Sequence, residues 1–295
     1  MTDSLSSRKT APHVRGAFDP ATNTVSYIVH DPATKAAAII DPVLDFTPRN
    51  GRTRTTSADL LLEAVRNDGL DLRYLLETHA HADHLSASHY LRERTGAPVV
   101  IGAHITDVQA IFADLFEADD VARDGSAFDT LVREGDTLPL GRMEIRVLHT
   151  PGHTPACVSY LIGDAAFVGD TLFMPDYGTA RADFPGGNAA TLYRSIKKLL
   201  SLPEETRILT GHDYPPPSRG NPAWEASVAE HRRANIHVHD GVEEAAFVAM
   251  REARDATLDA PLLILPSLQV NIRAGQMPPA SPGGHVYLKI PINAI

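Results

Sequence analysis

The chain has 295 residues, of which 43% are hydrophobic and 22% are charged, and its formal net charge is −10. This composition is typical of a globular protein with a large core and excludes a disordered or fibrous chain. Basic residues are scattered, and an acidic surface repels phosphates, so we expect no nucleic-acid partner.

The N-terminal half predicts alternating strands and helices. Apolar, β-branched runs at 24–31 and 36–42 indicate an antiparallel hairpin, and the polar segment 42–57 indicates a long loop. A helix is expected over 58–69, with Ser57 as its N-cap and Gly69 just past its end. Further along we expect a strand at 72–79, a helix at 85–96 that ends at Gly96, a strand at 97–103 and a helix at 105–116.

The C-terminal half predicts shorter strands. A strand over 143–154 stops at a Pro-Gly turn that carries His153. It is followed by strands at 157–164 and 165–170, a helix at 191–202, a strand at 207–214 and a mostly helical segment at 223–256. The Pro/Gly-rich tail after that segment shows no composition break that would mark a second domain.

These features bound the domain organisation. We expect a flexible N-terminus, residues 1–12, and a single α/β domain, 13–295, with a C-terminal extension from about residue 240. No apolar stretch approaches the roughly 20 residues that span a bilayer, and the N-terminus lacks an apolar signal core. The single cysteine, Cys157, rules out a disulfide framework within one chain and fits a reducing compartment. We therefore expect a cytoplasmic enzyme with no membrane partner.

Residues that bind metals well stand where the expected strands end. Asp170 and His212 lie at such ends, and His79 and His153 lie at or just past them. Ligands of α/β proteins bind along one edge of the sheet, so these side chains can converge there.

The segment E-T-H-A-H-A-D-H, residues 77–84, strengthens this expectation. It places His79, His81, Asp83 and His84 within six positions. Neutral imidazole binds zinc, iron, copper and nickel, and a carboxylate shifts the preference towards harder ions. A lone histidine is usually structural, whereas this density indicates a metal centre.

Four motifs together resemble the metallo-β-lactamase superfamily over roughly residues 14–235. They are T-H-A-H-A-D-H-L at 78–85, T-P-G-H-T at 150–154, F-V-G-D-T-L-F at 167–173 and G-H-D-Y at 211–214. The resemblance implies an αββα sandwich, the metallo-β-lactamase fold, with metals in a cleft along one edge. It also implies two metal sites: His79, His81 and His153 in one, Asp83, His84 and His212 in the other, with Asp170 bridging them.

Within the superfamily, the chain more closely resembles the persulfide dioxygenases, or sulfur dioxygenases, of the bacterial β-lactamase-hydrolase-like type. This resemblance implies one Fe(II) held by His79, His153 and Asp170, a two-histidine, one-carboxylate set that leaves open positions. The remaining residues of the set, His81, Asp83, His84 and His212, would then orient the ligands.

Three details favour this branch over glyoxalase II, and one departs from it. Cys157 follows His153 by four residues, Asp213 replaces a usual glutamate, and N-I-R-A-G stands at 271–275. The departure is Thr179, which stands where these dioxygenases usually have cysteine, with about two extra residues before Arg181 if a loop is inserted there. Cys157 itself is most simply a buried small hydrophobe.

The resemblance implies that glutathione persulfide reacts with O₂ to give sulfite and glutathione. Arg181 and Arg273 are candidates to hold the substrate carboxylates, because a guanidinium pairs with a carboxylate bidentately. Arg181 and Tyr214 are also the candidate catalytic residues, with Tyr214 donating a hydrogen bond near the metal. The alternatives are a structural salt bridge for each arginine and a packed tyrosine for Tyr214.

Other functions remain open at this stage. The main alternative is a dinuclear zinc hydrolase of glyoxalase II type that acts on a glutathione thioester. Zinc can also replace iron in the dioxygenase site by the ordinary affinity order of divalent metals. The complete ligand set argues against a metal-binding or redox-sensing partner protein, and a nuclease would need a basic groove or an added clamp domain. The resemblance further suggests a homodimer or a higher oligomer.

Overall fold

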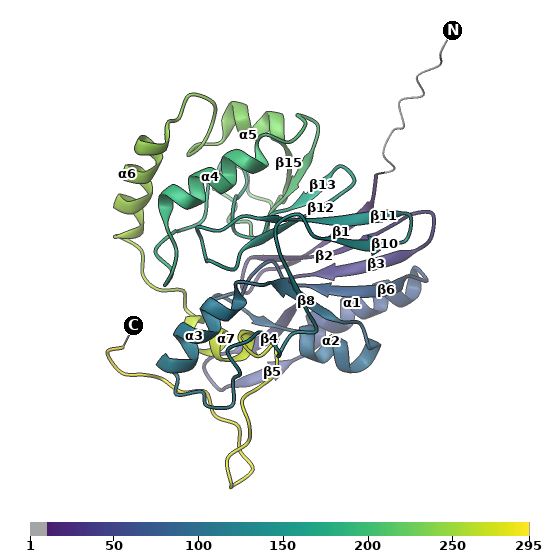
Figure 1. The fold of residues 1–295 in the computed structure, drawn as a ribbon, viewed down its shortest axis with the longest axis vertical. Helices are drawn as coiled ribbons and strands as arrows, with labels where there is room; N and C mark the ends of the chain where they lie inside the picture. The colour runs from purple at the N-terminus through teal and green to yellow at the C-terminus, as the bar shows by residue number, and fades with distance from the viewer. Residues whose placement is uncertain (1–10, 295) are drawn as a thin grey trace.

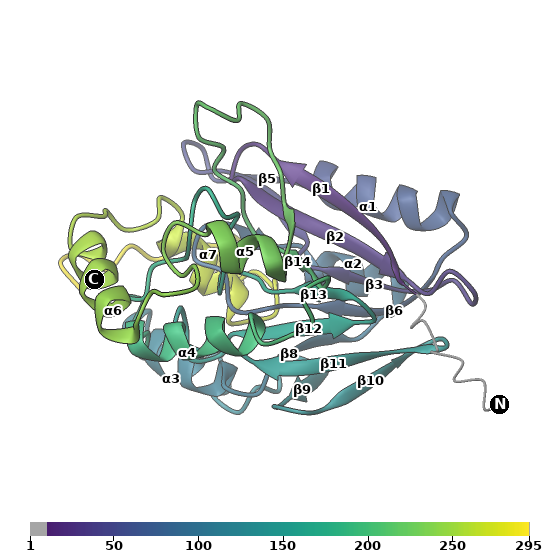
Figure 2. The ribbon, with the colours of Figure 1, turned by 90° about the horizontal axis from the view of Figure 1, so that it is seen from above.

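The structure, a computed structural model, describes residues 11–294; of the segment expected to be flexible, residues 1–10 lie outside the described residues. Two six-stranded sheets stack face to face, with helices on both outer faces (Figures 1 and 2). This confirms the predicted αββα sandwich. Among the described residues, no helix is both long and apolar enough to cross a bilayer.

The first sheet has the order β1-β2-β3-β6-β8-β9. Its N-terminal strands are antiparallel neighbours, and β3, β6, β8 and β9 run parallel to one another. Its strands are β1 (His13–Asp19), β2 (Thr24–His30), β3 (Ala36–Ile40), β6 (Asp71–Leu76), β8 (Val99–Gly102) and β9 (Thr130–Val132).

The second sheet has the strands in chain order, from β10 to β15. All its neighbours are antiparallel except β13 and β14, which are parallel and connected through a helix. Its strands are β10 (Thr137–Leu140), β11 (Met143–His149), β12 (Val158–Ile162), β13 (Ala165–Phe167), β14 (Arg207–Leu209) and β15 (Glu225–Ser227).

The helices cover the two outer faces in separate groups. Below the first sheet in Figure 1 lie α1 (Thr56–Asn67), α2 (Ser88–Thr95), α3 (Ile105–Leu115) and α7 (Ile264–Asn271). Above the second sheet lie α4 (Ala189–Leu199), α5 (Val228–Ala234) and α6 (Glu244–Asp255).

Three apolar clusters hold these layers together. The middle cluster joins the two sheets through fully buried side chains such as Ile40, Val100, Val147 and Phe167. The outer clusters join each sheet to its own helices. Fully burying one such side chain contributes roughly 1.5–3 kcal/mol, so the packed sheets give the loops at their ends a rigid base.

The expected long loop at 42–57 is wrong. Instead, β4 (Val43–Thr47) and β5 (Arg52–Arg54) form a hairpin, and β4 also pairs with β7 (Leu85–Ser86), which takes the first residues of the expected helix at 85–96. The segment looked like a loop because β5 is exposed and polar and only the start of β4 is buried.

The N-cap expected for the first helix is also wrong. The α1 helix begins after Thr55, and Ser57 lies in its first turn, where its N–H and hydroxyl both donate to the Asp45 carboxylate. The C-terminal signals are confirmed: Gly69 and Gly96 adopt the left-handed conformation just past α1 and α2. The β1, β9 and β10 strands and α7 were not predicted, and β15 lies in the segment 223–256 that was expected to be mostly helical.

Candidate metal centre

The predicted metal ligands lie in loops that begin where strands end. His79 follows the end of β6, and Asp41, which the sequence analysis did not single out, directly follows β3 in the same sheet. The second sheet contributes the other loops: His153 follows β11, Asp170 follows β13 and His212 follows β14. The two sheets therefore bring residues far apart in the chain to one edge of the sandwich.

Close backbone approaches hold these loops together. The N–H of Val158 in the second sheet donates to the carbonyl of Thr78 beside His79, at 2.9 Å. Gly169 has φ +51°, and a Cβ there would lie 2.5 Å from the Thr78 hydroxyl oxygen. Glycine is therefore required directly before Asp170, because a side chain would push the two ligand loops apart.

His79, His153 and Asp170 form the first cluster of ligand atoms. The Asp170 Oδ2 atom lies 3.8 Å from His79 Nε2 and 3.7 Å from His153 Nε2. Ligands of one ion, with bonds of about 2.0–2.2 Å, lie roughly 3–3.5 Å apart, so a small inward movement would close this set around a metal.

Hydrogen bonds orient both histidines of this cluster. The Thr78 hydroxyl donates to Asp41 at 2.8 Å, so the His79 Nδ1–H donates to that hydroxyl at 3.0 Å. The His153 Nδ1–H donates to the carbonyl of Arg181 at 2.8 Å. In each ring the Nε2 lone pair is therefore free to bind a metal, the arrangement that orients metal-binding histidines in proteins generally. The buried His79 Nε2 has no hydrogen-bond partner within residues 11–294.

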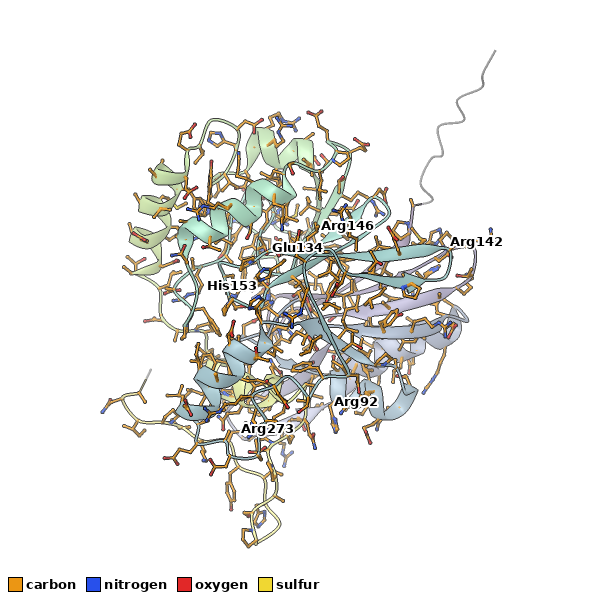
Figure 3. All side chains as sticks on the ribbon, in the orientation of Figure 1. Arg92, Glu134, Arg142, Arg146, His153 and Arg273 are labelled. Carbon is orange, nitrogen blue, oxygen red and sulfur yellow. The ribbon has the colours of Figure 1, made fainter. Side chains whose placement is uncertain are left out.

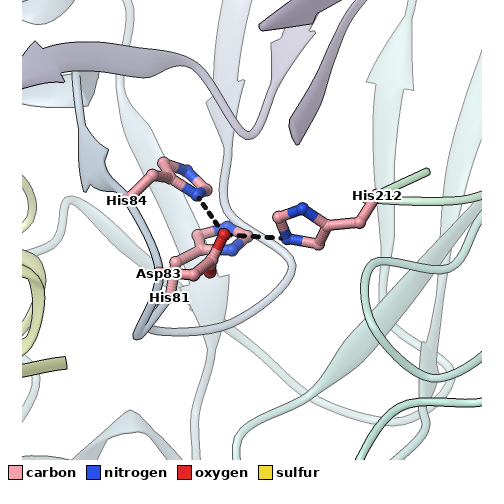
Figure 4. Close-up of side chains that lie close together, drawn as sticks. All are labelled: His81, Asp83, His84 and His212. Carbon is pink, nitrogen blue, oxygen red and sulfur yellow. Dashed lines mark hydrogen bonds and ion pairs between the residues drawn. The ribbon is translucent and has the colours of Figure 1, made fainter. Parts of the chain in front are cut away.

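The second cluster joins His81, Asp83, His84 and His212 (Figure 4). The Asp83 Oδ2 atom lies 3.2 Å from His212 Nε2 and 3.5 Å from His84 Nδ1. The Asp170 Oδ1 atom lies 3.4 Å from His212 Nε2, so Asp170 stands between the two clusters. The donor set of the described residues thus fits one metal ion in the first cluster and has room for a second.

Asp41 and Glu77 form a buried acidic pair behind His81, and the sequence analysis missed both. The His81 Nε2 atom lies 3.1 Å from Asp41 Oδ1 and 3.5 Å from Glu77 Oε2. Ser86 and Ser88 donate to the other Glu77 oxygen. The only local signal was the position of Asp41 at a strand end before Pro42.

These surroundings change the pKa values of the ligand histidines in opposite directions. Burial, together with the neighbouring histidines, holds the pKa of His79 well below its usual range. Burial also lowers the pKa of His81, but Asp41 and Glu77 outweigh it and raise that pKa well above the usual range. His79 is therefore neutral at physiological pH, the form that binds metals.

A cavity of about 530 Å³ opens beside the first cluster. Asp83, His153 and Asp170 line the part of it that we call the inner end, where His153 and Asp170 are buried. The rest of the wall combines aromatic, apolar and a few cationic side chains, including Phe46, Phe173, Tyr177, Tyr214, Arg181, Arg251, Arg254, Leu258 and Leu262. A concave, mostly apolar site with few polar groups suits a small organic molecule.

Tyr214 lies on the wall of this cavity, beside the clusters. Its ring stacks on His212, with centroids 5.8 Å apart, and on Tyr177, with centroids 4.9 Å apart. Burial, reinforced by Asp83 and Asp170, raises the pKa of the phenol far above its usual value. Tyr214 therefore keeps its proton and can act as a hydrogen-bond donor.

The two candidate arginines lie in different places. Arg181 lines the cavity, but its Nε and NH2 donate to Asp183 at 2.5 and 2.7 Å, and its NH1 donates to the carbonyl of Asp259. Arg273 does not line it and lies well apart from His153 in Figure 3. It is buried, and its guanidinium pairs with Asp120 and donates to the backbone carbonyl of Gln269. The geometry gives no support to Arg273 as a substrate ligand.

The remaining residues noted in the sequence have structural surroundings. Cys157 is buried, and burial raises the pKa of its thiol to about 12, so it stays protonated. Asp213 accepts hydrogen bonds from Arg219. Asn271, within N-I-R-A-G, is tied to the loop of the histidine cluster: its amide donates to the carbonyls of His81 and His84, both at 2.8 Å.

Comparison with known proteins gives three relatives that cover most of the chain. The chain is 55% identical, over 96% of its length, to a probable metallo-hydrolase of Burkholderia pseudomallei, 99% of which is covered. It is 52% identical, over 96% of its length, to the beta-lactamase hydrolase-like protein of Xylella fastidiosa, but it spans only 65% of that longer protein. It is 32% identical to the mitochondrial persulfide dioxygenase ETHE1 of Homo sapiens, with 68% of each chain covered.

A solved structure and a family comparison agree with these relatives. The structure of ETHE1 from Myxococcus xanthus matches with a TM-score of 0.72 and 35% identity, covering 90% of this chain and 100% of that one. The sequence pattern of the Metallo-beta-lactamase superfamily matches residues 19–212. With the αββα fold and the histidine-aspartate clusters at its edge, the chain belongs to the metallo-β-lactamase superfamily.

Proposed function

We propose that the chain is an iron-dependent persulfide dioxygenase that converts glutathione persulfide and O₂ to glutathione and sulfite. One persulfide, one O₂ and one water would give one thiol, one sulfite and two protons. The outer sulfur is oxidised, O₂ is reduced and the sulfur-sulfur bond breaks. The observation that carries the proposal is the cluster of His79, His153 and Asp170, two of which line the cavity. The likeness to two ETHE1 proteins supports it.

These three side chains would hold one Fe(II) per chain. Two histidines and one carboxylate leave coordination positions open. When bound, Fe(II) would supply the one-electron chemistry that lets O₂ react with a closed-shell sulfur compound.

The other residues around this cluster would prepare the site. Thr78 and the carbonyl of Arg181 hold the two histidine rings in their metal-binding tautomers. Tyr214 would donate a hydrogen bond to the reacting sulfur or oxygen, because its phenol stays protonated. The apolar wall would exclude water from the reaction. The single cysteine fits a reducing compartment, so we place this activity in the cytoplasm. The family resemblance suggests that the enzyme acts as a homodimer or a higher oligomer.

A dinuclear hydrolase that acts on a glutathione thioester is the second candidate. The observation in its favour is the second cluster of ligand atoms, at His81, Asp83, His84 and His212, which has room for a second ion. The relative named as a probable metallo-hydrolase points the same way.

The test is the metal content of protein purified without oxygen, together with O₂ uptake on glutathione persulfide. We expect about one iron per chain and rapid uptake, and the His79→Ala variant should lose both metal and activity by about a hundredfold or more. The His84→Ala variant, from the second cluster, should still bind one iron. Two zinc ions per chain, no O₂ uptake and hydrolysis of S-lactoylglutathione would overturn the proposal.

A further inference from the structure

The exposed part of the cavity wall, which we call its outer end, belongs to the segment that connects α6 to α7. This segment lies between the green and yellow helices of Figure 1. Leu258, Pro261, Leu262 and Leu263 line the cavity there, and Leu262 is 87% exposed. Arg254, in the last turn of α6, lines the cavity beside them. This end is therefore apolar apart from Arg254.

Three arginines line the cavity, and two of them already have ionic partners. Arg181 is held by Asp183, as described above. Arg251 is almost fully buried, and its Nε and NH2 contact Asp255 at 2.9 and 2.6 Å, while NH1 donates to the carbonyl of Thr179. Neither arginine is available to a ligand without breaking these contacts.

Arg254 differs from both. Its guanidinium makes no ion pair or hydrogen bond within residues 11–294, and the residue is exposed. Free surface arginines are ordinary, but this one lines the same cavity as the metal ligands. Among the described residues, it is the cavity's one cation without an ionic partner.

Charge is thus distributed unevenly along the cavity. Asp83 and Asp170 stand at the inner end and Arg254 at the outer end. A ligand with a carboxylate would be repelled at the inner end unless a metal compensates, and attracted at the outer end. An anionic thiol would enter with its sulfur towards the metal ligands and its carboxylate towards Arg254.

We propose that Arg254 binds a carboxylate of the organic thiol that carries the persulfide sulfur, and so makes the site selective for anionic carriers. The proposal rests on the proposed function for the identity of the reacting group. It also replaces Arg181 and Arg273 as the expected carboxylate ligands. The carbon chain of the carrier would pack against Leu258, Leu262 and Leu263.

The test compares Arg254→Gln with wild-type protein, both loaded with metal, by calorimetric titration with glutathione and with its diethyl ester, which lacks both carboxylates. We expect glutathione to bind Arg254→Gln about five- to tenfold more weakly, since a partly exposed ion pair is modest in strength. The ester should bind both proteins with similar, weak affinity. Added salt should weaken glutathione binding to wild type more than to the variant. Arg66→Gln, an exposed arginine on α1 outside the cavity lining, is the matched control and should bind like wild type.

Kinetics with glutathione persulfide should show the same pattern. KM should rise by about the same five- to tenfold factor in Arg254→Gln while kcat stays near that of wild type, because the contact is remote from the reacting sulfur. Unchanged glutathione affinity in a folded Arg254→Gln protein would overturn the inference, as would wild-type protein that does not bind glutathione. If wild type binds glutathione through Arg254 but takes up no O₂, the dioxygenase proposal fails, whereas the carboxylate contact at Arg254 stands.

Discussion

The Asp41 carboxylate contacts both Thr78, which directly precedes His79, and His81, a member of the second cluster. It accepts the Thr78 N–H at 2.7 Å and the Thr78 hydroxyl at 2.8 Å, and it faces His81 Nε2. Its own backbone has φ 48°, in the left-handed region, which costs a non-glycine residue roughly 1–3 kcal/mol. Strain of this kind persists where the surrounding contacts outweigh it. The carboxylate also lies with Glu77 and His81 in a third group of possible ligand atoms, so Asp41 belongs to the metal centre.

The Asp41→Asn variant should therefore bind metal more weakly while keeping its fold. The asparagine oxygen can still accept from Thr78, and asparagine tolerates the left-handed conformation, but the carboxylate that faces His81 is lost. We expect metal affinity to fall about ten- to a hundredfold, measured by competition with a chelator. Asp31→Asn is the control, because that carboxylate caps a turn remote from the centre. Equal metal affinity in Asp41→Asn and wild type would show that the contact between Asp41 and His81 supports only the fold.

At the scale of elements, α7 is hydrogen-bonded to the loop that carries His81 and His84. Besides its two bonds to the carbonyls of His81 and His84, Asn271 accepts the N–H of Ser86 at 2.8 Å. Gly275 follows with φ +86°, and a Cβ there would lie 2.7 Å from the carbonyl of Ser86. The C-terminal α7 helix is thus in contact with a residue 190 positions earlier in the chain.

Asn271→Ala should destabilise both the protein and its metal site. The change leaves three buried backbone groups without their partner, at roughly 1 kcal/mol or more each, so we expect a loss of about 3 kcal/mol in urea unfolding. Asn188→Ala, which removes the N-cap of α4, should cost only about 1 kcal/mol and leave metal binding unchanged. If Asn271→Ala costs no more than this control, α7 does not stabilise the loop.

The ligand set was predictable from sequence because it lies in short motifs at strand ends. Such motifs can be recognised without knowing which distant segments contact them. Partners remote in sequence were not predictable. The sequence around Arg273 does not indicate its ion pair with Asp120, and the sequence around Asn271 does not indicate its hydrogen bond to His84. For the same reason the polar hairpin of β4 and β5 looked like a loop, since its stability comes from pairing with β7 and from contact with α1.

At the scale of the whole molecule, two histidines outside the metal clusters make stability depend on pH. Burial lowers the pKa of His231 and of His237 to about 4. His231 is fully enclosed, whereas His237 is half-buried and accepts a hydrogen bond from the N–H of Thr179. An unfolded histidine titrates near 6.5, so between about pH 6.5 and 4 the unfolded chain binds more protons than the folded one. The free energy of unfolding that the two neutral histidines contribute is therefore complete above about pH 6.5 and is lost as the pH falls towards 4.

The His231→Phe variant isolates this contribution, because phenylalanine fills the buried position without titrating. Between about pH 7 and pH 4.5, wild type should lose about 2–3 kcal/mol more unfolding free energy than this variant, from a pKa displacement of roughly two units or more. Urea unfolding at both pH values measures the difference, and acid effects on the metal ligands cancel because both proteins share them. His285→Phe, at an exposed histidine, should follow wild type. If the stability of His231→Phe falls as steeply as that of wild type, the acid sensitivity originates in other groups and His231 is not the buried neutral residue described here.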